Sequence, residues 1–194
     1  MKRIAFFVLA VLATGLIART HAAEFNAVQP EQNSVTFTAK QMGVPVDGRF
    51  RKVNAAISFD PARPTTGSTL IEIDLASIDA GSDEANGEVV GKQWFDVKRF
   101  PSARFVSSAV RAVGGNRYEA VGQLMLKGRS QEIVAPFTVQ TQGSGANATA
   151  TFSGSFVLKR AEFGIGEGAW ADFATVANDI PIRFQFVVKA KAAK

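Results

Sequence analysis

Apolar and polar residues alternate along most of this chain, and a period of two predicts antiparallel β-strands with one face turned to a core. The clearest stripe is the last one, in which polar residues separate Ile180, Ile182, Phe184, Phe186 and Val188. Similar stripes begin at Val35, Ile57, Ile71, Tyr118, Ile133 and Phe152. With the stretch 103–113, the pattern predicts about eight strands.

Turn-forming residues separate these stripes, at 60–61, 64–68, 114–116 and 143–147. One segment, from Ser82 to about Gly91, predicts a short helix, because Ser82 is a favourable N-cap and two acidic residues follow it. No linker, repeat or low-complexity segment divides the chain, so we expect one domain. Eight antiparallel strands either close into a barrel or stack as a two-sheet sandwich, and the pattern alone leaves both open.

The N-terminus has the layout of a secretory signal peptide. A positive start at Lys2 and Arg3 precedes an apolar run over 4–18, and the segment ends in small residues at Ala22 and Ala23. We expect cleavage after Ala22, which makes 1–22 a signal peptide and 23–194 the exported domain; cleavage after Ala23 is the alternative. A retained membrane anchor is disfavoured, because the run is short for a span of about 20 residues. The expected location is a bacterial periplasm.

The exported part would contain neither histidine nor cysteine, since the only histidine, His21, leaves with the leader. Serine–histidine, cysteine–histidine and soft-metal chemistry are therefore not expected. No pair of carboxylates has a spacing typical of acid–base catalysis or of an oxygen-ligand metal site. Leader removal takes three basic residues and no acidic ones, leaving 19 against 17 and a net charge of +2 instead of +5. We predict a protein that is not an enzyme, with no catalytic residues, cofactor or metal, and no nucleic-acid partner.

Phenylalanine is abundant, with 14 of its 16 copies beyond residue 22, against one tyrosine. Such rings supply apolar surface without a polar group that needs a partner. Two interpretations remain open: a dry, packed core, or a cavity for a long apolar molecule. The candidate lining residues are Phe37, Phe59, Ile71, Ile73, Phe105, Leu124, Phe137, Phe152, Phe156, Phe184 and Phe186.

Two local strings predict the structure of the barrel rim. The alternating glycines of 160–168 suggest a backbone bend, and nucleotide binding is rejected because no helix follows them. Arg160 either holds an anionic head group or is solvated or ion-paired. The aromatic string at 94–96, followed by Pro101, predicts a segment that covers the barrel as a plug or as a gate. The rim or head-group candidates are Trp94, Phe95, Arg160, Phe163 and Trp170.

Several short strings, taken in order, resemble the YceI-like family of exported, lipocalin-like polyisoprenoid-binding proteins. They include Gln41-Met42-Gly43, Val46-Asp47-Gly48-Arg49-Phe50, Ser77-Ile78-Asp79, Trp94-Phe95-Asp96-Val97, Phe100-Pro101 and 160–164. The resemblance implies an all-β fold, an extended eight-stranded antiparallel lipocalin-like barrel with a short helical insertion. The chain departs from the family pattern at Gln41, where many relatives have histidine, and at 83–86, where many have an Asp-x-Leu-Arg-like stretch.

The resemblance also implies a ligand, a long isoprenoid chain from a polyprenyl phosphate or an isoprenoid quinone. The leading hypothesis is thus a periplasmic binding or carrier protein for such a lipid. The alternatives are a ligand-free stress-response barrel and an accessory protein to membrane quinone electron transfer. A membrane-associated redox or lipid-pathway partner and a homodimer are left open.

Overall fold

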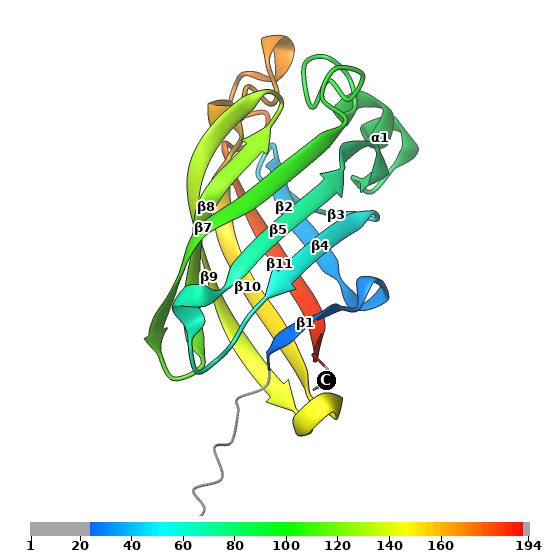
Figure 1. The fold of residues 1–194 in the computed structure, drawn as a ribbon. Helices are drawn as coiled ribbons and strands as arrows, with labels where there is room; N and C mark the ends of the chain where they lie inside the picture. Colours follow the sequence, from blue (N-terminus) through cyan, green and yellow to red (C-terminus); the bar gives the residue numbers. More distant parts are fainter. Residues whose placement is uncertain (1–23, 192–194) are drawn as a thin grey trace, which may run out of the picture.

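Eleven β-strands form one strongly curved antiparallel sheet in the computed structural model, which describes residues 24–191 (Figure 1). The predicted signal peptide lies outside the described residues. The strands are β1 (Phe25–Val28), β2 (Ser34–Gln41), β3 (Val44–Phe50), β4 (Val53–Ser58), β5 (Ser68–Asp74), β6 (Ile78–Asp79), β7 (Ser102–Gly114), β8 (Arg117–Leu126), β9 (Arg129–Gln142), β10 (Thr149–Lys159) and β11 (Asp179–Ala190). The all-β, antiparallel class is confirmed, whereas the expected count of about eight strands differs from the eleven observed.

Two interrupted strands account for most of the difference in count. Only Arg51 and Lys52 separate β3 from β4, and the short turn 75–77 separates β5 from β6. β4 pairs with β5, and β3 pairs with β6. β3 and β4 together therefore act as one bent strand, which runs beside a second bent strand made of β5 and β6. The Arg51 N–H donates to the Ser77 carbonyl at 3.0 Å, and the Asp74 N–H donates to the Lys52 carbonyl at 3.2 Å, so hydrogen bonds cross the interruption.

The strand pairing returns to its starting point and makes a barrel rather than a sandwich. From β4 it passes through β5, β7, β8, β9, β10, β11 and β2 to β3, which continues along the chain into β4. With the interrupted pairs joined, eight long strands follow one another around this ring. The ring closes along the chain and not through a continuous ladder, because within residues 24–191 β3 pairs with β6 at two positions and β4 pairs with β5 on one side only.

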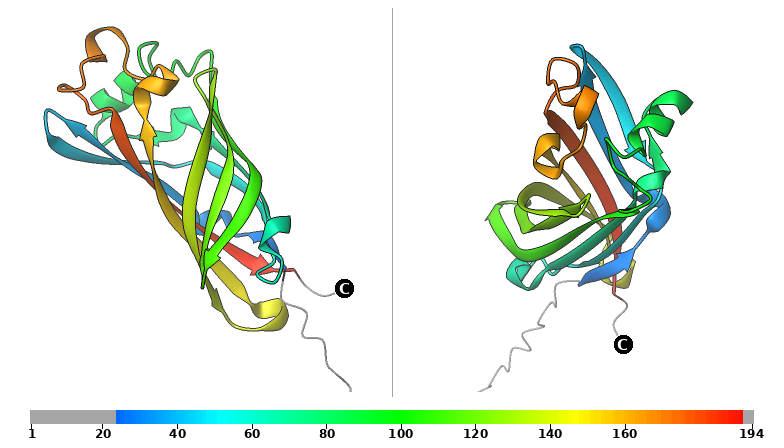
Figure 2. Two further views of the ribbon diagram at one scale, coloured as in Figure 1. Left: turned by 90° about the vertical axis from the view of Figure 1, so that its left-hand side faces the viewer. Right: turned by 90° about the horizontal axis from the view of Figure 1, so that it is seen from above.

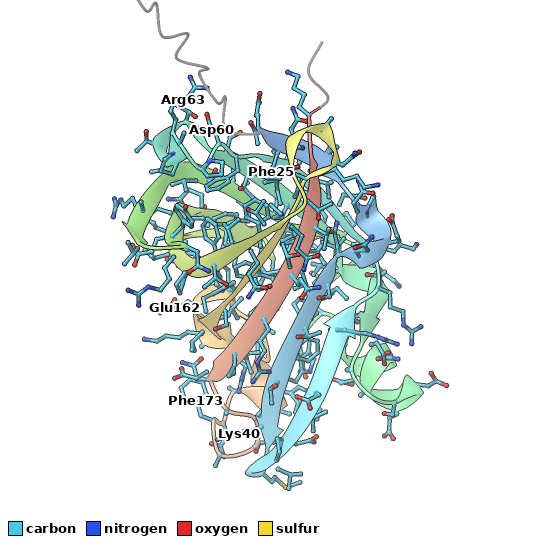
Figure 3. The ribbon with its side chains drawn as sticks, turned by 90° about the horizontal axis from the view of Figure 1, so that it is seen from below. Phe25, Lys40, Asp60, Arg63, Glu162 and Phe173 are labelled. Atoms are coloured by element: carbon cyan, nitrogen blue, oxygen red, sulfur yellow. The ribbon has the colours of Figure 1, made fainter. Side chains whose placement is uncertain are left out.

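The remaining strand, β1, is short and seals one end of the barrel. It pairs with β11, and its Phe25 exchanges two backbone hydrogen bonds, of 2.9 and 3.0 Å, with Phe59 just beyond β4. Figure 3 shows Phe25 at this end, close to Asp60 and Arg63. The Asp60 carboxylate accepts hydrogen bonds from the Arg63 Nε and the Ala62 N–H, both at 2.9 Å, and fixes the turn that leaves β4.

Aromatic side chains fill the barrel interior near this sealed end. The Phe59 ring packs edge-on against Tyr118, with ring centroids 5.1 Å apart, and against Phe152, at 5.3 Å. Phe137 stacks on Tyr118 with centroids 5.5 Å apart. Edge-on and offset contacts of this kind suit the charge distribution of aromatic rings. This end of the barrel therefore has the packed core that one of the two sequence interpretations describes.

Other phenylalanine rings lie over glycines of the neighbouring strand. Phe37 of β2 faces Gly48 of β3, and Phe184 of β11 faces Gly154 of β10. A Cβ atom at Gly48 would lie 2.2 Å from the Phe37 Cζ, and one at Gly154 would lie 2.5 Å from the Phe184 Cζ. Each ring therefore occupies the space that a side chain would take, and lies against the wall instead of pointing to the barrel axis.

The predicted helix is confirmed as α1 (Asp83–Val89), which ends two residues before the expected Gly91. The Ser82 hydroxyl caps it by accepting a hydrogen bond from the Ala85 N–H at 3.2 Å. The helix lies beside the barrel at the end opposite β1 (Figures 1 and 2). No helix within residues 24–191 is long and apolar enough to cross a membrane.

We predict that Gly154→Ala destabilises the protein by about 1–3 kcal/mol, because its Cβ would also lie 2.2 Å from the Pro136 carbonyl oxygen and overpack the wall. Gly87→Ala is the control. Gly87 lies inside α1 with nothing within 4 Å of an added Cβ, so alanine should stabilise the helix by about 0.5–1 kcal/mol. Urea unfolding monitored by circular dichroism measures both changes. Equal unfolding midpoints for the two variants would contradict the role of Gly154.

Candidate functional site

Two adjoining cavities occupy the barrel interior. The wider one has a volume of about 500 Å³ and extends to α1 and to the loop that follows β10, whereas the narrower one has about 120 Å³ and lies nearer to β1. They share five lining residues, which places them end to end: Val35, Ile73, Leu124, Phe156 and Ile182. A volume of about 500 Å³ falls within the usual range of about 300–1,000 Å³ for small-molecule sites.

The walls of both cavities are overwhelmingly apolar. Within the described part of the chain, no charged side chain lines the narrow cavity, and the charged residues that line the wide one are Glu84, Glu88 and Arg160. Within residues 24–191, no three histidine, cysteine, aspartate or glutamate side chains come together as a metal site would require. The chemistry that such walls support is the burial of an apolar molecule.

The structure brings all the predicted lining residues to these walls. Phe37 lines the wide cavity, while Ile73, Leu124 and Phe156 line both. The remaining predicted residues line the narrow cavity: Phe59, Ile71, Phe105, Phe137, Phe152, Phe184 and Phe186. Alternation along the strands sends these side chains inward, which is why the pattern could find them.

Much of the wall of the wide cavity was not predicted from the sequence. Phe50 belongs to β3, where Val46, Gly48 and Phe50 alternate with Asp47 and Arg49, so the same period of two could have indicated its inward position. Five further unpredicted lining residues belong to turns, loops and α1: Leu75, Ala80, Val89, Ile165 and Val176. Their inward positions follow from tertiary packing, for which strand periodicity carries no signal.

The mouth of the wide cavity lies among its exposed polar lining residues. These are Gln41, at the end of β2, and three residues at or within α1: Ser82, Glu84 and Glu88. Figure 2 shows α1 on one side of this end of the barrel and the loop after β10 on the other. The Trp170 Nε1 of that loop donates a hydrogen bond to the Glu88 Oε1 at 2.8 Å and thereby joins the two sides.

Arg160 organises the loop from β10 to β11, and its side chain is 1% exposed. Its Nε donates to the Ala177 carbonyl at 3.1 Å. One terminal nitrogen donates to the carbonyls of Ile165 and Gly166, at 2.8 and 2.9 Å. The other donates to the carbonyls of Trp170 and Val176, at 2.8 and 2.7 Å. All five N–H groups of the guanidinium are thus used by the backbone of one loop.

This geometry corrects the interpretation of Arg160 as solvated or ion-paired. Within the described chain no carboxylate lies within ion-pair distance, and backbone carbonyls surround the charge instead. Burial lowers the pKa of the Arg160 guanidinium from its usual value, because desolvation penalises the charged form. Arg160 lines the wide cavity, yet it has no N–H left to donate to a head group.

The other rim candidates divide into lining residues and a core residue. Trp94, Phe95 and Trp170 line the wide cavity, and the two tryptophan rings are 5.4 Å apart. The Trp94 Nε1 is buried and has no hydrogen-bond partner within residues 24–191. Phe163, by contrast, is buried in a hydrophobic cluster and lines neither cavity, so its selection as a rim residue is not supported.

The segment that contains Trp94 covers the wide end of the barrel, as its aromatic string predicts. The Gln93 carbonyl accepts hydrogen bonds from the N–H groups of Gly166 and Glu167, at 2.8 and 2.9 Å. The Phe95 ring packs edge-on against Phe50, with centroids 6.2 Å apart. The covering segment and the loop organised by Arg160 are therefore one connected structure at the mouth.

Comparisons with known proteins agree with this architecture. Residues 27–188 match the model of the YceI-like domain. A UPF0312 protein of Pseudomonas savastanoi pv. phaseolicola is 30% identical over 146 residues, which make up 74% of each chain. Among solved structures, Burkholderia cenocepacia BcnA is 42% identical in sequence and superposes with a TM-score of 0.77. The match covers 82% of this chain and 98% of BcnA.

A more distant structure shares the fold alone. A polyisoprenoid binding domain from Saccharophagus degradans has a TM-score of 0.67 and covers 88% of this chain and 100% of that one. Its sequence identity is 17%, so the likeness concerns the arrangement of the strands.

We predict that Arg160→Lys destabilises the protein by at least about 3 kcal/mol, because an ammonium has three donors and leaves buried carbonyls unpaired. Arg183→Lys is the matched control. The Arg183 side chain is exposed and donates to the Thr38 hydroxyl at 3.1 Å, so its loss should change stability by about 0.5 kcal/mol or less. Guanidinium unfolding compares the two variants. Similar losses in both would show that the five carbonyl contacts do not stabilise the loop.

Proposed function

The chain belongs to the YceI-like family, and on that premise we propose that it is a binding or carrier protein that holds a long isoprenoid lipid inside its barrel. The single observation that carries this proposal is the pair of adjoining apolar cavities, of about 500 and 120 Å³. Their walls have few polar groups that could bind a polar substrate, but a large apolar surface against which a hydrocarbon chain can pack. Burial of each CH₂ group from water contributes about 0.8 kcal/mol, so a long lipid needs few polar contacts.

The shape of the interior supports an elongated ligand with a polar end. The aromatic cluster around Phe59 closes the interior on the β1 side, and polar side chains gather at the mouth on the α1 side. A lipid tail would extend from the mouth toward Phe59, with its head group near α1. The shared fold of the Saccharophagus degradans polyisoprenoid binding domain supports the same class of ligand.

The wide cavity weighs against the ligand-free alternative, because a filled barrel would leave no such volume at its centre. Among isoprenoid lipids, a quinone and a polyprenyl phosphate remain the two proposals. Delivery of a quinone to a membrane redox enzyme is a second function that the same cavity would serve. We propose a binding role rather than an enzymatic one.

Lipid extraction from protein produced in a bacterial periplasm tests this function and the identity of the ligand. Native mass spectrometry should show a stoichiometric adduct, and mass spectrometry of the solvent extract should identify an isoprenoid chain. A quinone would support the electron-transfer role, whereas a polyprenyl phosphate would oppose it. A mass without adduct that stays unchanged after incubation with both lipids would contradict the proposal.

The exported location is proposed from the pattern of residues 1–22. We predict that the protein recovered from a bacterial periplasmic extract begins at Ala23, as measured by intact mass and N-terminal sequencing. The small residues Thr20 and Ala22 would occupy the positions that the signal peptidase recognises. Recovery of a chain that keeps residues 4–18 in the membrane fraction would show an anchor instead.

We predict that Phe184→Asp weakens binding of an isoprenoid lipid by at least about tenfold, because it places a charge in the wall of the narrow cavity. Val157→Asp is the control, since Val157 is exposed on the outside of β10. Binding is measured by the fluorescence of the chain's two tryptophans, Trp94 and Trp170, which both line the wide cavity. Unchanged affinity in a folded Phe184→Asp protein would contradict a tail site at this position.

A further inference from the structure

We infer that the mouth of the cavity selects lipids whose head group donates hydrogen bonds and carries no negative charge. An isoprenoid alcohol, an isoprenoid hydroquinone and an isoprenoid amine meet this description. A polyprenyl phosphate, which is anionic, and an oxidised quinone, which only accepts hydrogen bonds, do not. This inference rests on the proposed function, because it assigns the head group of a lipid whose tail lies in the barrel.

Two carboxylates face the mouth from one side of α1. Glu84 and Glu88 are four residues apart in the helix, so they lie on the same face one turn apart, and both line the wide cavity. The Glu88 Oε1 accepts the hydrogen bond from Trp170, and its Oε2 is not engaged by another residue within 24–191. Within the same described range, no hydrogen bond or ion pair engages the Glu84 carboxylate. These oxygens are therefore available as acceptors at the entrance.

No cation in the described part of the cavity wall is available to neutralise an anionic ligand. Arg160 is the one basic residue among the lining residues that the structure describes, and backbone carbonyls use all five of its N–H groups. The other polar side chains at the mouth, Gln41 and Ser82, are uncharged. A phosphate placed there would meet two like charges without a charged donor, which disfavours its binding.

The opposite end of the interior offers no second place for a head group. The narrow cavity has no charged lining residue within residues 24–191, and Phe25 and Phe59 seal it through paired backbone hydrogen bonds. Its polar lining residues are Ser58 and Thr69, so a charged group buried there would lose its hydration without a charged partner. The head group must therefore lie at the mouth, where the carboxylates of Glu84 and Glu88 favour a donor.

Four ligands with the same tail separate charge from hydrogen bonding: farnesol, farnesylamine, farnesyl methyl ether and farnesyl phosphate. Lipid-stripped exported protein is titrated with each of them, and binding is measured by tryptophan fluorescence and calorimetry. We expect farnesol and farnesylamine to bind at least about tenfold more tightly than farnesyl phosphate. Farnesyl methyl ether, which cannot donate, should bind more weakly than farnesol. Tighter binding of the amine than of the alcohol would indicate a cationic natural head group, and the reverse order an uncharged one.

Glutamine at both acidic positions tests whether the carboxylates cause this order. The variant Glu84→Gln/Glu88→Gln should narrow the ratio between farnesol and farnesyl phosphate toward one, while the new amide at position 88 keeps an oxygen for the Trp170 hydrogen bond. Glu84→Gln alone, which leaves that bond untouched, should narrow the ratio in part. Glu132→Gln, at an exposed position on β9 that lines neither cavity, should leave the ratio unchanged.

Three outcomes would overturn the proposals, and they are distinguishable. Farnesyl phosphate that binds the native protein as tightly as farnesol would overturn the head-group inference and leave the lipid-binding function intact. An unchanged ratio between farnesol and farnesyl phosphate affinity in the double glutamine variant would also overturn the head-group inference alone. No binding of any of the four ligands would instead overturn the proposed function.

Discussion

The guanidinium of Arg160 is the interaction on which the open end of the barrel depends. It is a buried charge whose compensation comes from five carbonyl dipoles of a single loop rather than from a carboxylate. The loop must curl around the guanidinium to bring these carbonyls together, and Gly166 permits this with a φ of +74° and no Cβ, which would lie 2.3 Å from the Arg160 Nη1. Ile165, Trp170 and Val176 thereby become parts of the cavity wall.

The same composition produces a packed core at one end of the barrel and a hollow at the other. At the sealed end, Phe59, Tyr118 and Phe152 meet near the axis and fill the space. Toward the open end, Phe37 lies over Gly48 and leaves the axis free. Whether a phenylalanine fills or lines the interior thus depends on the residue that faces it on the next strand.

Alternation along the strands was sufficient to predict the all-β class and the inward position of every residue in the predicted lining set, because a pleated strand turns every second side chain to the same face. It missed β1, β3 and β6. β1 and β6 are short and have partners that are distant in sequence. It also could not predict the role of Arg160. That role depends on the path of the loop 164–177, and the sequence signal available was the alternation of glycines at 164, 166 and 168. The resemblance to the YceI-like family supplied the barrel where the strand pattern left a sandwich open.

In the proposed function, different parts of the barrel would determine the affinity for the lipid tail and the specificity for the head group. The strands provide an apolar wall that gains free energy with each buried methylene, whatever group ends the chain. In the proposed complex the head group would meet α1 and the loop after β10, which carry the charged lining residues Glu84, Glu88 and Arg160. Because α1 lies outside the strand pairing and the loop joins it only at the bridge between Gln41 and Val176, substitutions elsewhere in these segments can change the preferred head group without disturbing the ring of strands. One barrel can therefore serve different lipids, and the family alone does not determine the ligand.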